Sequence, residues 1–197
     1  RLGTPIKPLD LSSVRHTWIP GRLAVWLARR SGVRHYSYTA FYDEWAAARD
    51  MLGQRQPTLY HVLYGDDSFR YLGGMRPFRW HRVVATYHQP PDFLEDHIQA
   101  REYLRTLDAV VVVSRNQLSF FSPIVDPECL FWIPHGVDTI AFQPYDARRP
   151  GQTGKRNCIF VGMHKRDFET LLEVIELVGQ ADEQVQFSIV TAPSQAS

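Results

Sequence analysis

The sequence has little of what would place it in several common functional classes. Its two cysteines, Cys129 and Cys158, lie far apart in the chain, so neither a disulfide framework nor a zinc site is predicted. The formal net charge is only +1, which gives no electrostatic case for a nucleic-acid partner. Apolar runs such as residues 109–113 are far too short to span a bilayer. With no secretory segment near Arg1, we expect a cytoplasmic protein.

What the sequence does contain is a regular alternation of β-prone and helical segments. β-prone runs occupy residues 35–40, 59–64, 82–87, 109–113, 130–133, 158–161 and 185–191. Apolar residues at helical spacing occupy residues 22–30, 42–52, 92–104 and 167–178. This order predicts an α/β fold with a parallel sheet covered by helices. The valines at 110–113 predict a strand that is buried on both faces.

A polar segment rich in proline and glycine separates two such patterns. Residues 144–156 carry four basic residues and no apolar periodicity, which is typical of a linker. We therefore expect one domain over residues 1–143 and the start of a second over residues 157–197. Since a single β–α–β unit cannot bury a core alone, the second domain is expected to be incomplete in this chain.

His88 is the first candidate functional residue. It directly follows the β-prone run 82–87, and two prolines, Pro90 and Pro91, stop that run from continuing. Ligands of parallel α/β proteins bind just outside the carboxyl ends of the strands, where an imidazole can donate or accept a hydrogen bond. The alternative is a turn histidine that bonds only to backbone.

Two further segments carry candidate residues. In the segment 133–138, Gly136 is expected to form a tight turn with positive φ, and Asp138 is expected to cap the following turn. In the second segment, Gly162 precedes a helix that begins near Asp167, a plausible N-cap residue. Free N–H groups at a helix start attract anions, and Lys165 and Arg166 add positive charge there. Plain turn chemistry and solvated basic side chains are the alternatives.

Taken in order, these segments resemble the retaining glycosyltransferases of the GT-B fold, family 4 type. The resemblance covers residues 57–178 and rests on Thr-Tyr-His88, on Ile-Pro-His-Gly-Val-Asp138, and on Phe-Val-Gly162 followed by a helix. It implies two Rossmann-like domains that face a cleft, with the acceptor on the first and a nucleotide-sugar donor on the second. It also implies metal-independent transfer with retention, and no cofactor besides the donor.

The resemblance assigns roles to individual residues. His88 matches the strand-end histidine that reaches the donor sugar, and residues 134–138 match a Pro-Asn-Gly-Val-Asp turn in which His135 replaces Asn. Gly162 matches the glycine before the phosphate-binding residues, but Met163 stands where the family has arginine. Lys165 or Arg166 would then bind the phosphates, and Arg166 is favoured because a guanidinium grips phosphate with two hydrogen bonds.

The segment Tyr64-Gly-Asp66-Asp67 resembles the metal motif of RNA polymerases. Because the chain is nearly neutral and of α/β pattern, we interpret it as a strand end that contacts acceptor hydroxyls, with a simple helix cap as the alternative. Acidic residues and histidines near His88 lack the spacing of metal ligands, so no metal site is predicted. The acceptor can be a carbohydrate, a lipid or a small molecule.

Residues 16–34 carry four arginines, with Arg15 directly before them, together with Trp18, Trp26 and several aliphatic side chains. Such a helix can lie on an anionic membrane surface, which would place the protein on the inner face of a membrane. A core helix with a solvated basic face is the alternative. For the whole chain, two other functions fit the pattern: a nucleotide-sugar 2-epimerase of the GT-B type, and a non-catalytic module that binds a nucleotide sugar or a partner.

Overall fold

The computed structural model describes residue 8 and residues 19–143, 156–162 and 166–191. The chain divides into two compact units, residues 1–137 and residues 138–197, which we call the first and second units. Most of the predicted linker, residues 144–155, lies outside the described residues. No helix in the described part of the chain has both the length and the apolar character needed to cross a bilayer.

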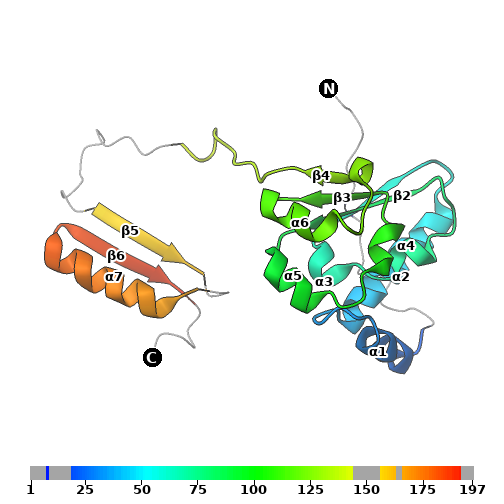
Figure 1. Ribbon diagram of the computed structural model, residues 1–197, viewed down its shortest axis with the longest axis horizontal. Coiled ribbons are helices and arrows are strands. Elements are labelled where there is room, and N and C mark those ends of the chain that lie inside the picture. Colours follow the sequence, from blue (N-terminus) through cyan, green and yellow to red (C-terminus); the bar gives the residue numbers. More distant parts are fainter. Residues whose placement is uncertain (1–7, 9–18, 144–155, 163–165, 192–197) are drawn as a thin grey trace. The chain divides into compact units, whose positions relative to one another are not determined.

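A parallel four-stranded sheet forms the centre of the first unit (Figure 1). Its strands are β1 (Leu59–Val62), β2 (Arg82–Tyr87), β3 (Ala109–Val112) and β4 (Leu130–Trp132), in the spatial order β1-β2-β3-β4. The α-helices are α1 (Gly21–Arg29), α2 (Tyr38–Gly53), α3 (Gly65–Ser68), α4 (Leu72–Met75), α5 (Pro91–His97) and α6 (Leu118–Phe121). The 3-10 helices are η2 (Glu102–Thr106), η3 (Arg115–Gln117) and η4 (Pro127–Cys129). The predicted α/β fold with a parallel sheet is confirmed.

The core of the first unit lies on one face of this sheet. Each strand adds to the same side of its predecessor, and right-handed crossovers then place the connecting helices on one face (Figure 1). On that face Val83, Val110 and Val112 are fully buried. On the opposite face Val111 is partly exposed and Phe131 is exposed. The prediction that 110–113 is buried on both faces is therefore wrong, because only alternate side chains of β3 face the helices.

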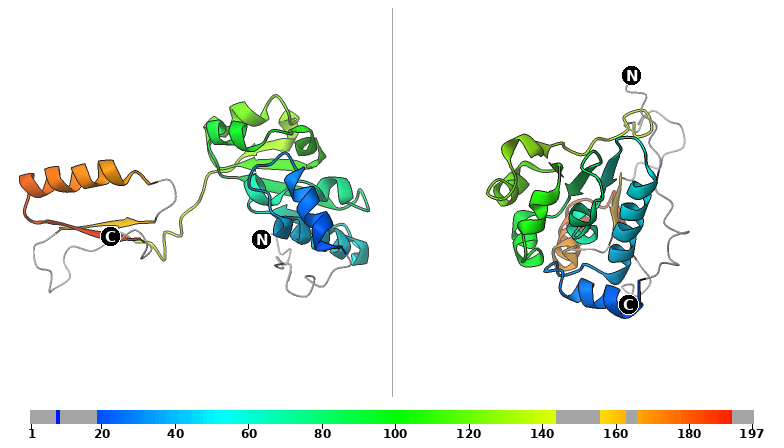
Figure 2. Two further views of the ribbon diagram at one scale, coloured as in Figure 1. Left: turned by 90° about the horizontal axis from the view of Figure 1, so that it is seen from below. Right: turned by 90° about the vertical axis from the view of Figure 1, so that its right-hand side faces the viewer.

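Two other segments differ from the prediction. Residues 35–40 do not form a strand, because the Ser37 hydroxyl accepts the Ala40 N–H at 3.1 Å and α2 begins there. Residues 92–104 do not form one helix, since Ile98 leaves α5 to pair with Val33 in an isolated antiparallel bridge. In both places a contact at the helix end outweighs the local pattern. Helix α1 packs against α2 (Figure 2). The Tyr42 hydroxyl donates to the Ile19 carbonyl at 3.1 Å.

The second unit contains one β–α–β motif. Strands β5 (Arg156–Val161) and β6 (Val185–Val190) pair in parallel, and α7 (Phe168–Ala181) lies on one side of them (Figures 1 and 2). The predicted N-cap of α7 is confirmed, because the Asp167 carboxylate accepts the Thr170 N–H at 3.0 Å. Among the described residues of this unit, none is buried.

Candidate functional site

The loop after β2 lies at the carboxyl edge of the first sheet. Strand β2 ends in Tyr87, whose fully buried ring packs on Phe121 with the ring centroids 4.7 Å apart. His88 follows at once, and α5 begins at Pro91 after the extended Pro90. The structure therefore places His88 at the strand end, as predicted from the sequence.

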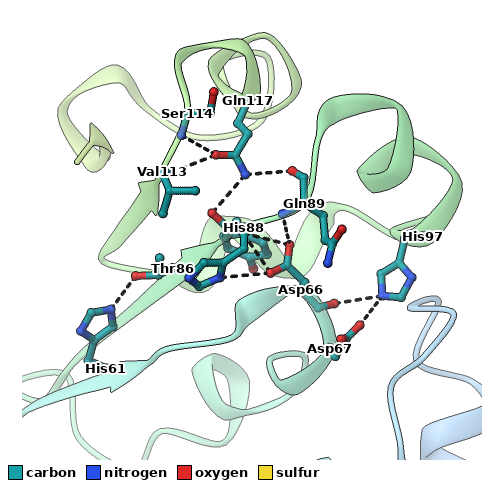
Figure 3. A network of polar contacts seen from close by, with 11 residues as sticks. His61, Asp66, Asp67, Thr86, His88, Gln89, His97, Val113, Ser114 and Gln117 are labelled. Carbon is teal, nitrogen blue, oxygen red and sulfur yellow. Dashed lines mark hydrogen bonds and ion pairs between the residues drawn. The ribbon is translucent and has the colours of Figure 1, made fainter. Parts of the chain in front are cut away.

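Asp66 holds the backbone of this loop from one side (Figure 3). Its carboxylate accepts the His88 N–H at 3.0 Å and the Gln89 N–H at 3.2 Å, and the whole residue is 2% exposed. Burial raises the pKa of Asp66, while the two N–H groups and the nearby His88 oppose that rise. A buried carboxylate is costly unless it is hydrogen-bonded, so this residue is committed to the loop.

Gln117 holds the same loop from the other side (Figure 3). Its amide group donates to the Tyr87 carbonyl at 3.0 Å and to the Gln89 carbonyl at 2.8 Å. Its carbonyl oxygen accepts the N–H groups of Val113 and Ser114, at 2.9 and 2.8 Å. Fully buried Gln117 thereby joins the end of β3 to the end of β2.

The glycine before Asp66 allows α3 to reach β2. A Cβ added to Gly65 would lie 2.8 Å from a Tyr87 ring carbon, closer than carbon atoms approach without strain. The next acidic residue, Asp67, has its Oδ1 atom 2.9 Å from Nε2 of buried His97, and that nitrogen is also 3.1 Å from the Asp66 carbonyl oxygen. The segment Tyr64 to Asp67 thus follows the end of β1 and forms the start of the short helix α3. The described residues contain no group of three His, Cys, Asp or Glu side chains that could hold a metal ion.

The His88 imidazole lies between two other rings. Its centroid is 5.0 Å from that of Tyr64 and 5.3 Å from that of His135. Its Nδ1 atom lies 3.5 Å from Asp66 Oδ2 but makes no hydrogen bond among the described residues. The His88 side chain is 23% exposed, so Nε2 is the ring nitrogen left to meet a ligand.

The segment after β4 differs from its prediction in one respect. Gly136 has no positive φ, and a Cβ added there would meet no atom within 4 Å, so the expected tight turn is wrong. This segment has no regular secondary structure, and it brings His135 onto His88. The cap by Asp138 is confirmed, since its carboxylate accepts the N–H groups of Ile140 and Ala141 at 2.9 and 3.0 Å, which lowers its pKa.

The candidate anion site of the second unit is described only in part. Gly162 has a φ of 109°, a conformation that favours glycine, and its N–H donates to the Val190 carbonyl at 3.1 Å. The Arg166 guanidinium lies 5.8 Å from the Phe160 ring centroid, whereas Lys165 lies outside the described residues. The Asp167 carboxylate already occupies the start of α7, so Arg166 is the cation next to an acidic cap.

Outside these segments, a hollow of the first unit lies beside α1. It has a volume of about 550 Å³, and its lining includes Arg29, Arg34 and Asp96 but no residue of the loop after β2. Arg34 and Asp96 form an exposed ion pair there. On α1 itself, Trp26 is 49% exposed under the Arg30 guanidinium, which leaves both predicted roles of residues 16–34 open.

Gln117 and His135 were missed as partners of His88. For Gln117 a signal existed, because Ser114-Arg-Asn-Gln117 has the spacing of a capping box, and the structure contains that box. No local pattern announces the ring contact of His135. Neither the protein-family models nor the curated proteins with which the chain was compared gave a match.

Proposed function

We propose that the chain forms the acceptor-side unit and part of the donor-side unit of a GT-B glycosyltransferase that uses a nucleotide sugar. One observation carries the proposal: two buried polar side chains, Asp66 and Gln117, bond the peptide groups on both sides of His88. The loop lies where parallel α/β sheets bind ligands. Fixing a loop in this way is the preorganisation that a catalytic side chain needs.

In the proposed reaction the acceptor hydroxyl oxygen forms a bond to the anomeric carbon of the donor sugar. The bond from that carbon to the diphosphate oxygen breaks, and its electron pair leaves with the nucleoside diphosphate. The acceptor proton passes to the departing diphosphate or to solvent. His88 Nε2 would hydrogen-bond the donor sugar and hold it in position, while Arg166 and Lys165 would offset the charge on the diphosphate. Retention of configuration follows from the family resemblance.

Asp167 favours a second candidate function. Its carboxylate caps α7 at the place where a diphosphate would otherwise meet free N–H groups. A module that binds a nucleotide sugar or a partner without turning it over fits this acidic cap. Binding without release of nucleoside diphosphate would favour the module over the transferase.

The experiment is to incubate the full-length protein with a panel of uridine, guanosine, adenosine and thymidine diphosphate sugars and to measure release of nucleoside diphosphate. We expect release with one donor, and a loss of about 100-fold or more in kcat/KM for His88→Ala. His61→Ala is the matched control, because His61 bonds Thr86 on β2 at 2.7 Å and does not contact the loop.

Two results would count against the proposal. If no donor in the panel is bound or cleaved by the full-length protein, the glycosyltransferase assignment is wrong. If a donor is cleaved but His88→Ala and His61→Ala behave alike, the assignment stands and the role of His88 is wrong.

A further inference from the structure

Three aromatic side chains form a row along the carboxyl edge of the first sheet. Tyr64 follows β1, His88 follows β2 and His135 follows β4. The ring planes of Tyr64 and His88 are 31° apart, and those of His88 and His135 are 22° apart. We call these three residues the aromatic row. His135 follows β4, yet its ring contacts the ring of His88, which follows β2, although β3 lies between these two strands in the sheet.

The outer ring of this row faces solvent. Tyr64 is 65% exposed although it contacts His88, so much of its ring surface is free. Its hydroxyl has no hydrogen-bond partner in the described ranges, whereas Tyr42, Tyr60 and Tyr71 each donate to an oxygen acceptor. An aromatic ring with an open face and an unused polar edge is suited to a ligand that is apolar in the middle and polar at its rim.

The middle residue of the row is also held in place before any ligand arrives. The backbone at His88 is fixed by Asp66 and Gln117, so little conformational entropy remains to be lost there on binding. Three residues after Tyr64, the Asp67 carboxylate contacts His97 but is 52% exposed, so it can still accept hydrogen bonds from hydroxyl groups. Ring faces and hydroxyl acceptors together match a pyranose, which has C–H groups on its faces and hydroxyls at its rim.

We propose that the aromatic row binds a pyranose ring of the acceptor, so that the acceptor of the proposed transferase is a carbohydrate. This inference rests on the proposed function only in that it makes the bound sugar the acceptor. The binding site itself lies wholly in the first unit. The sugar ring stacks on the free face of Tyr64, and its rim hydroxyls bond to the Tyr64 hydroxyl and to Asp67.

The experiment is an NMR titration of the whole chain with methyl glycosides of glucose, galactose, mannose and N-acetylglucosamine, followed through the ring signals of Tyr64 and of its neighbour His88. We expect at least one glycoside to shift these signals. Tyr64→Ala, which removes both the ring and the hydroxyl, should weaken that binding about 10-fold or more, while Tyr64→Phe, which loses only the hydrogen bond of the hydroxyl, should weaken it about 2- to 5-fold. Tyr38→Ala is the matched control, because Tyr38 is 51% exposed at the start of α2.

Uridine and adenosine are titrated for comparison. The inference is overturned if no glycoside shifts the ring signals, if only these nucleosides shift the ring signals, or if Tyr64→Ala binds a glycoside as tightly as Tyr38→Ala does. Far-UV circular dichroism of each variant shows that it is folded. If glycoside binding depends on Tyr64 but the protein turns over no donor, the aromatic row is a sugar-binding site and the proposed transferase function is wrong. If the protein turns over a donor but the acceptor KM is unchanged by Tyr64→Ala, the transferase function stands and the aromatic row is not the acceptor site.

Discussion

Asp66 is the residue on which the position of His88 depends most directly. Its carboxylate accepts two backbone N–H groups in a nearly solvent-free place, and burial raises its pKa above the ordinary 3.8. The folded state therefore holds the Asp66 proton more tightly than the unfolded state does. As pH rises from about 3.8 through the raised pKa, the contribution of Asp66 to stability falls.

The substitution Asp66→Asn tests whether the contribution of Asp66 to stability falls as pH rises. The amide replaces one acceptor oxygen by donors that face N–H groups, which should cost about 1–3 kcal/mol. Because asparagine does not titrate, the difference in unfolding free energy from the wild type should shrink as pH rises from about 3 to about 7. Chemical denaturation at several pH values within this range measures the difference.

Asp108→Asn is the control with the opposite sign. Burial alone would raise the pKa of Asp108, but the Val83 N–H together with Arg82 and Arg76 lowers it. Its contribution is present above pH 3.8 and is lost as pH falls, so the cost of Asp108→Asn should grow as pH rises. Equal pH trends for both variants would contradict the assigned directions.

At the scale of single elements, β3 shows how a uniform sequence can hide two different environments. The consecutive valines predict a strand buried on both faces, yet Val110 and Val112 are fully buried and Val111 is not. The reason is topological, because crossovers of one hand in a sheet of order β1-β2-β3-β4 put their helices on one face.

A matched pair of substitutions checks this difference. Val110→Thr places a hydroxyl among helices, where it has to be buried, and should cost about 1–3 kcal/mol. Val111→Thr makes the same chemical change one residue away on the open face and should cost less than about 0.5 kcal/mol. Thermal or chemical unfolding of both variants gives the comparison. Similar losses would mean that the second face of β3 is also covered.

At the scale of the whole molecule, the two units differ in how much they bury. The first unit has a core of buried side chains around β2 and β3, while no described residue of the second unit is buried. Strand pairing without a buried side chain leaves the backbone hydrogen bonds open to water. The second unit should therefore open locally without the first.

Amide hydrogen exchange on the whole chain measures this property. Strands β2 and β5 are each six residues long, but β2 pairs with β1 and β3 within the core whereas β5 pairs only with β6. We expect amides of β5 to exchange about 100-fold faster than those of β2, because β2 opens only with the core. Equal protection of both strands would show that the units unfold together.

Local sequence patterns were enough to predict the features that depend on near neighbours. Alternating segments predicted the strands of both sheets, Pro90 and Pro91 marked the end of β2 before His88, and Asp167 marked the start of α7. Such features follow from backbone preferences and caps that act over a few residues. Even there, the Ser37 cap outweighed a β-prone run.

Contacts between residues far apart in the chain set how the candidate site is built. The Asp66 carboxylate meets the His88 N–H across 22 residues, and Gln117 meets the Tyr87 carbonyl across 30 residues. His135 follows β4 and still reaches His88 at the end of β2, although β3 lies between these two strands in the sheet. Contacts of this kind depend on the order of strands in the sheet and on which face the helices cover, and neither is written in a local pattern.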